Sequence, residues 1–109
     1  MTSTSRIEAL LQMLERGQDS ALLRFSLGVE YRAEERYADS ILHLTEAVKL
    51  DPGYSAAWKL LGRSLESAGR GADAGQAWRK GIEAAESKGD RQAAKEMAVF
   101  LKRLEKRGL

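Results

Sequence analysis

Residues 21–54 decide the fold, because their pattern returns in the residues that follow. They read ALLRFSLGVEYRAEERYADSILHLTEAVKLDPGY, and residues 55–88 read SAAWKLLGRSLESAGRGADAGQAWRKGIEAAESK. Leu27-Gly28 of the first copy matches Leu61-Gly62 of the second, 34 residues later. This period, with these residue types, predicts that each copy is a pair of helices joined by a turn.

The first copy predicts helices over residues 20–34 and 37–50. Their apolar residues recur at helical spacing, namely Leu23, Leu27 and Tyr31 in one and Ile41, Leu44, Ala47 and Val48 in the other. Only a tight turn fits between the two helices, so they must be antiparallel. Gly28 then faces Ser40, and a side chain larger than a methyl group there would force the backbones apart.

The second copy predicts helices over residues 55–68 and 71–87. Asp51-Pro52 stops the preceding helix, because proline disfavours helical geometry in the residue before it. Ser55 is expected to cap the next helix, and Gly69 to end it in a left-handed conformation. The core-facing residues are Trp58, Leu61, Gly62, Leu65, Ala74, Trp78 and Ile82. Gly62 is expected to lie opposite Ala74.

Two further helices flank the repeats. The first spans residues 4–16, with Ile7, Leu10, Leu11 and Leu14 on one face, and Gly17 ends it. Asp19 or Ser20 caps the helix that follows. The last spans residues 90–107 with Asp90 as its cap, and its apolar face is Ala94, Met97, Ala98, Leu101 and Leu104. Each flanking helix is expected to close one end of the stack.

With these motifs the chain resembles the tetratricopeptide repeat family. The resemblance implies an all-α, right-handed α-solenoid of antiparallel helix pairs, with six helices in one domain. We expect a half repeat over residues 1–19, full repeats over 21–54 and 55–88, and a capping helix over 89–109. Three residues depart from the repeat pattern: Arg24 where the second copy has Trp58, Glu35 where it has Gly69, and Glu86 where the first has Pro52.

Composition restricts the class of protein. The chain has 109 residues, a net charge of +2 and 31% charged residues, which describes a surface with both signs. Cysteine is absent, which excludes disulfides and thiolate chemistry and fits a reducing compartment. No apolar run reaches the roughly 18 residues of a membrane span. We expect a cytoplasmic protein with no membrane partner.

The family resemblance implies that the first helix of each pair lines a concave groove. The faces that the core pattern leaves unused then supply the candidate partner-binding residues, which are Leu22, Phe25, Val29, Arg32, Ala56, Lys59, Arg63 and Glu66. Leu22, Phe25 and Val29 form an apolar stripe separate from the core-facing one. The expected function is an adaptor or assembly factor that holds a peptide or helix of another protein.

Three interpretations of the apolar stripe stay open. It is core, buried under a flanking helix; it is an exposed patch, rimmed by Arg32, Lys59 and Arg63, that binds a partner; or it is the interface of a homodimer. Family members that bind chaperone tails hold the terminal carboxylate with a clamp of lysine, asparagine and arginine. The corresponding residues here are Phe25, Val29, Leu60, Asp90 and Ala94, so no such binding is predicted.

Other chemistry is not expected. His43, the only histidine, lies one turn from Glu46, and two ligands do not make a metal site, so His43 is predicted to face solvent. No catalytic constellation or phosphate loop is recognisable, so we expect no enzyme and no cofactor. Lys102, Arg103, Lys106 and Arg107 form a basic end, which is predicted to be a solvated face and not a nucleic-acid site.

Overall fold

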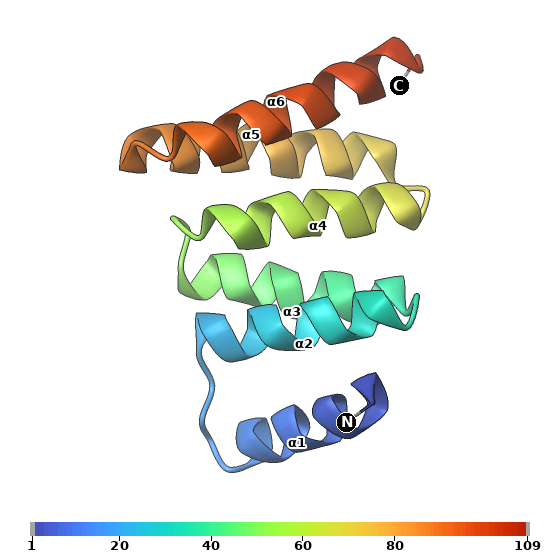
Figure 1. Ribbon diagram of the computed structural model, residues 1–109, viewed down its shortest axis with the longest axis vertical. Coiled ribbons are helices and arrows are strands. Elements are labelled where there is room, and N and C mark those ends of the chain that lie inside the picture. The colour runs from blue at the N-terminus through green and yellow to red at the C-terminus, as the bar shows by residue number, and fades with distance from the viewer. Residues whose placement is uncertain (1, 109) are drawn as a thin grey trace.

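The computed structural model describes residues 2–108, which form six consecutive helices stacked along the longest axis (Figure 1). They are α1 (Ser3–Glu15), α2 (Ala21–Ala33), α3 (Tyr37–Leu50), α4 (Ser55–Ser67), α5 (Gly71–Lys88) and α6 (Arg91–Lys106). No strand occurs in this part of the chain. The predicted all-α solenoid is confirmed, and every predicted helix is found within one residue at each end.

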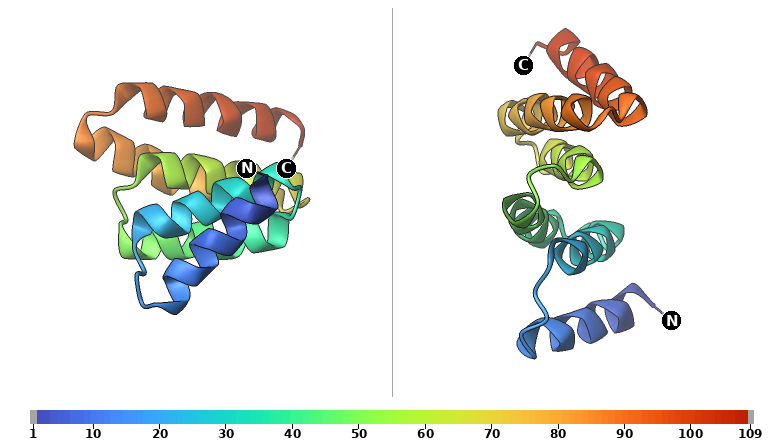
Figure 2. Two further views of the ribbon diagram at one scale, coloured as in Figure 1. Left: turned by 60° about the horizontal axis from the view of Figure 1, so that its bottom comes forward. Right: turned by 90° about the vertical axis from the view of Figure 1, so that its left-hand side faces the viewer.

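The helices form two rows, which the right-hand view of Figure 2 separates. Each helix packs on its neighbours in the chain, and α4 also contacts both α2 and α6. The helices α2, α4 and α6 therefore make one continuous row, with α3 and α5 on the other side of the stack. Within residues 2–108, α1 packs on α2 alone, so it covers one end.

Left-handed residues end several helices, as the sequence predicts for Gly17 and Gly69. Their φ angles are +83° and +78°, and Gly89 after α5 has a φ of +75°. Glu35 holds the place in the first repeat that Gly69 holds in the second, and its φ is +58°. The first repeat therefore makes the same turn with a residue for which this conformation is strained.

Side-chain caps begin three of the helices. Thr2 and Ser20 cap α1 and α2, and Asp90 caps α6 by accepting a hydrogen bond from the Ala93 amide at 3.1 Å. The prediction that Ser55 caps α4 is wrong. Ser55 is the first helical residue, and its buried hydroxyl has no hydrogen-bond partner among residues 2–108. The preceding turn places Tyr54 at the cap position.

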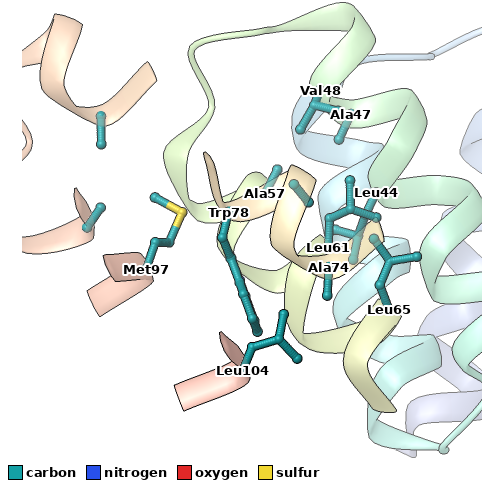
Figure 3. Close-up of a cluster of buried hydrophobic side chains, with 13 residues drawn as sticks. Leu44, Ala47, Val48, Ala57, Leu61, Leu65, Ala74, Trp78, Met97 and Leu104 are labelled. Carbon is teal, nitrogen blue, oxygen red and sulfur yellow. The ribbon is translucent and has the colours of Figure 1, made fainter. Parts of the chain in front are cut away.

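The main core lies between α3, α4, α5 and α6 (Figure 3). Leu44, Leu61, Trp78 and Met97 meet there, and Trp78 is completely buried. A smaller cluster joins α1 to α2, with Ile7 buried against Leu27 and Tyr31. The apolar faces predicted for the repeats are thus the faces that pack.

Two glycines allow the paired helices to approach each other. Ser40 donates a hydrogen bond of 2.8 Å to the Gly28 carbonyl, which confirms that these residues face one another, and a Cβ at Gly28 would overlap Leu44. A Cβ at Gly62 would overlap the Trp78 indole. Trp78 is the nearest side chain to Gly62, as Leu44 is to Gly28, and the position of Ala74 opposite Gly62 stays a prediction.

The register of α6 differs from that of the earlier helices. Glu86 stands where the first repeat has Pro52, and α5 continues to Lys88 with 18 residues against 14 in α3. The buried residues of α6 therefore come two positions later in the chain than the 34-residue period predicts, and they include Ala93 and Met97. Ala98, predicted to be on the buried face, is exposed. It takes the position in α6 that Gly62 has in α4, and residues 2–108 contain no further helix to pack over it as α5 packs over Gly62.

Candidate functional site

Two grooves open along the row of α2, α4 and α6, one on each side of α4. The first, which we call the apolar groove, has a volume of about 570 Å³. Its lining includes Phe25, Val29, Arg32, Ala56, Lys59 and Leu60. These residues come from α2 and α4, and Tyr37 at the start of α3 closes one end.

The apolar side chains of this groove pack on the core on one side and are exposed to solvent on the other. Phe25 is half-buried against the main core, and its ring lies 5.0 Å from that of Tyr54. Val29 is 38% exposed, and Leu22, which lies on the same stripe outside the groove, is 66% exposed. No flanking helix among residues 2–108 covers Leu22 or Val29, so the interpretation of these two residues as core is wrong.

The cations near the apolar groove already have partners. Lys59 Nζ lies 3.1 Å from Glu96 Oε1. Arg32 donates hydrogen bonds to Ser64 and Ser67, at 3.5 and 3.2 Å, and its guanidinium lies 5.6 Å from the Tyr37 ring centroid. Arg63, expected on the same rim, does not line this groove. The rim is therefore less strongly cationic than the sequence suggested.

The second groove, which we call the basic groove, lies between α4 and α6 and has a volume of about 540 Å³. Its lining residues are Arg63, Glu66, Phe100, Arg103, Lys106 and Arg107. The guanidinium of Arg63 lies 4.7 Å from the Phe100 ring centroid, and Arg107 pairs with Glu66. Of the predicted partner-binding residues, Arg63 and Glu66 are here.

Sequence reasoning missed the residues that complete the two grooves. Leu60 and Tyr37 line the apolar groove, but Leu60 entered only as a residue at a clamp position. Phe100 falls between the helix faces of the predicted pattern, and the register of α6 brings it against Trp78 at a ring distance of 5.4 Å. The longer α5, which the missing proline implies, is the signal that could have placed α6 correctly.

His43 lies inside the stack, so its predicted exposure to solvent is wrong. It is 6% exposed and stacks on Tyr31 with ring centroids 5.5 Å apart. Arg24 donates to His43 Nδ1 at 3.1 Å, since a guanidinium has no acceptor, and Arg24 also pairs with Asp19. Burial lowers the pKa of His43 below its ordinary value, and the Arg24 charge lowers it further.

Residues 2–108 contain no group of three or more potential metal ligands of the histidine, cysteine, aspartate or glutamate type. None of the six helices combines the length and the apolar character needed to cross a bilayer.

Comparisons with known proteins agree on the family. The family model described as Tetratricopeptide repeat matches residues 25–88. A TPR repeat-containing protein of Pseudomonas aeruginosa is 48% identical over 100 residues, which cover 92% of this chain and 95% of that protein. A solution structure of a protein from Bordetella parapertussis is 46% identical, with a TM-score of 0.80, and covers 93% of this chain and 88% of its own.

A more distant structure shares the fold. The tetratricopeptide repeat domain protein of Salinibacter ruber, determined by NMR, is 24% identical, with a TM-score of 0.74 over 80% of this chain and 88% of its own. The repeat spacing, the two rows of helices and these matches lead to one conclusion: the chain belongs to the tetratricopeptide repeat family.

Proposed function

We propose that this protein is an interaction module that holds an apolar segment of a partner protein in the apolar groove. Tetratricopeptide repeats generally serve protein–protein interaction, and helical repeats bind partners on the extended surfaces that stacking creates. The observation that carries the proposal is the exposed stripe of Leu22 and Val29 beside half-buried Phe25. The role would be that of an adaptor or assembly factor in the cytoplasm.

The mechanism is docking on a preformed surface. Phe25 is fixed by Tyr54 and the core, so little side-chain entropy is lost when a ligand covers it. Burial of apolar surface contributes about 25 cal/mol per Å² before the costs of association. Arg32 and Lys59, at the edge of the groove, then orient polar groups of the ligand. No step of this mechanism is catalytic.

A pair of matched variants tests the proposal. Val29→Asp puts a charge into the apolar groove, while Leu42→Asp makes the same kind of change on α3, where Leu42 is 58% exposed and lines neither groove. Each variant is first shown by circular dichroism to be folded, and is then used with the wild type to capture proteins from lysate of the source cells. We expect the partner to be lost with Val29→Asp and kept with Leu42→Asp.

Loss with Leu42→Asp alone would place the partner on the opposite row and contradict the proposal. The second candidate function is self-association, favoured by the same exposed Leu22 and Val29. Sedimentation of the wild type and of Val29→Asp separates the two. A dimer that Val29→Asp dissociates would assign the stripe to a homodimer interface, and a monomer at every concentration would eliminate that alternative.

A further inference from the structure

The basic groove has a higher net positive charge than the chain as a whole. Four cations and one carboxylate line it, which gives a net charge of +3, whereas the whole chain has +2. Glu66 is already paired with Arg107. Neither Arg103 nor Lys106 has an acidic partner among residues 2–108. Outside the groove half of the cations form ion pairs, for example Arg36 with Asp39 and Arg70 with Asp73.

Helix electrostatics account for only part of this cluster. Cations in the last turn of a helix are stabilised by its macrodipole, which suits the three basic residues near the end of α6. Arg63 belongs to α4 and lies before the last turn of that helix, which contains no basic residue. It faces the α6 cations across the groove, where mutual repulsion opposes their approach. An anionic ligand between the two helices would relieve that repulsion.

The groove is also partly preorganised. The Phe100 ring, which packs on completely buried Trp78, supports the guanidinium of Arg63. Glu66 likewise holds Arg107 in place, through an ion pair. Guanidinium groups held in place lose less side-chain entropy when they bind a carboxylate in a bidentate manner. Two cations are thus positioned by the protein and two remain available.

We propose that the basic groove binds an acidic segment, aspartate or glutamate side chains, of the same partner whose apolar residue occupies the apolar groove. This inference rests on the proposed function. The charge excess selects carboxylates, and the site is distinct from the chaperone-tail clamp, because its residues are not those at the clamp positions. The partner peptide therefore crosses α4, with an apolar anchor on one side and an acidic cluster on the other.

The separation of the grooves predicts the spacing in the ligand. Neighbouring packed helices lie about 8–10 Å apart, and the lining residues of the two grooves are offset along α4 by about six residues at 1.5 Å each. The displacement across α4 and the displacement along it are perpendicular, so together they separate the two groove centres by about 12 Å. An extended chain spans that distance with about four residues. A ligand should carry its acidic cluster about four residues from its apolar anchor.

Selection from a display library of random short peptides tests this arrangement on the full chain at physiological salt. The wild type should enrich peptides with a large apolar residue and an acidic cluster at that spacing. For the double variant Arg63→Glu, Arg103→Glu the acidic cluster should disappear from the selected peptides while the apolar residue remains. The matched control is Lys95→Glu, Lys102→Glu, two exposed residues of α6 that line neither groove.

The affinity of a selected peptide should fall by at least about tenfold in the Arg63, Arg103 variant, since one lost charge-assisted hydrogen bond alone is worth about that factor, and stay nearly unchanged in the control. Selected peptides without acidic residues would overturn the inference and leave the proposed function intact. Acidic peptides without an apolar anchor would contradict the proposed function, and with it the two-groove arrangement, and would leave only the preference of the basic groove for carboxylates. If instead a labelled single-stranded oligonucleotide binds at physiological salt and the same variant abolishes its binding, the groove is a nucleic-acid site and the inference falls.

Discussion

The two repeats have the same arrangement of helices and differ in most of the side chains packed between them. Where the first has Gly28 against Leu44, the second has Gly62 against Trp78. The inner row differs as well, since Phe25 and Val29 of the first repeat become Lys59 and Arg63 of the second. The spacing of the helices is therefore tolerant of what lies between them, and the inner face is free to change from apolar to cationic for binding.

The buried faces of α3 and α5 differ in polarity, which gives each repeat its own sensitivity. Buried Ser40 and His43 of the first repeat are replaced by Ala74 and Ala77 of the second. Ser40 hydrogen-bonds Gly28 and Ser64, and His43 accepts from Arg24, so the first repeat depends on polar partners. The second depends on Trp78. Four experiments sharpen this contrast, in order of expected effect.

Removal of Trp78 should have the largest effect. Trp78 is completely buried and its indole nitrogen donates to the Lys59 carbonyl at 3.2 Å, so Trp78→Ala should destabilise by about 3–5 kcal/mol. Leu44→Ala, the matched change in the first repeat, should cost about 2–5 kcal/mol and less than Trp78→Ala. Urea unfolding followed by circular dichroism measures both. A larger cost for Leu44→Ala would show that the second repeat does not depend on its tryptophan as argued.

Alanine at the two glycines should come next. Gly62→Ala forces the rigid indole of Trp78 aside, with an expected cost of about 1–3 kcal/mol, whereas at Gly28 the overlapping atoms belong to the more adaptable Leu44. Gly28→Ala should therefore cost less. A double-mutant cycle of Gly62→Ala with Trp78→Leu, which copies the first repeat, should show favourable coupling. Strict additivity would mean that the indole is not what limits residue 62.

The first repeat alone should respond to pH through His43. Its pKa is depressed by burial and by Arg24, so below pH 6.5, its ordinary value, the unfolded chain takes up a proton that the folded chain resists. Stability from this group is complete above that pH and falls as pH decreases, by at most about 1.4 kcal/mol per unit.

The control for this pH dependence is His43→Asn, which keeps an acceptor for Arg24 and does not titrate. Its unfolding free energy should fall less steeply than that of the wild type between pH 6.5 and the acid range. The other charges near His43 are Asp19, Asp39 and Glu46, which raise its pKa and are present in both proteins. Equal slopes would show that His43 is not a source of acid sensitivity.

Exchange of the turn residues should have the smallest effect. Glu35→Gly relieves a left-handed conformation with a φ of +58°, and should stabilise by about 1 kcal/mol, while Gly69→Glu should destabilise by a similar amount. Thermal unfolding of the two single variants measures the difference. A loss of stability in Glu35→Gly would indicate that the Glu35 side chain makes a contribution larger than the strain.

Sequence periodicity predicted the fold well because an apolar core position in one repeat recurs at the matching position of the other. Leu27 and Leu61, for example, confirm one another as core residues. Two features were beyond its reach. His43 lies at a position that is exposed by simple counting on a helix, but Arg24 and Tyr31 supply partners that only the packed structure brings together.

The basic groove shows the second limit. Its residues come from α4 and from the end of α6, and they meet only because the longer α5 shifts the register of α6. The basic end was visible in the sequence, whereas its meeting with Arg63 and Phe100 was not. Local patterns predict helices and their buried faces, while a groove depends on how distant helices are aligned.

The most direct test of the account is photo-crosslinking in the source cells, with a benzophenone amino acid placed at residue 29 or at residue 42. Both native side chains are exposed, and they lie on opposite rows of the stack. We expect an adduct with one partner protein from residue 29, none from residue 42, and loss of that adduct when Leu22→Asp is added. An adduct from residue 42 and none from residue 29 would contradict it.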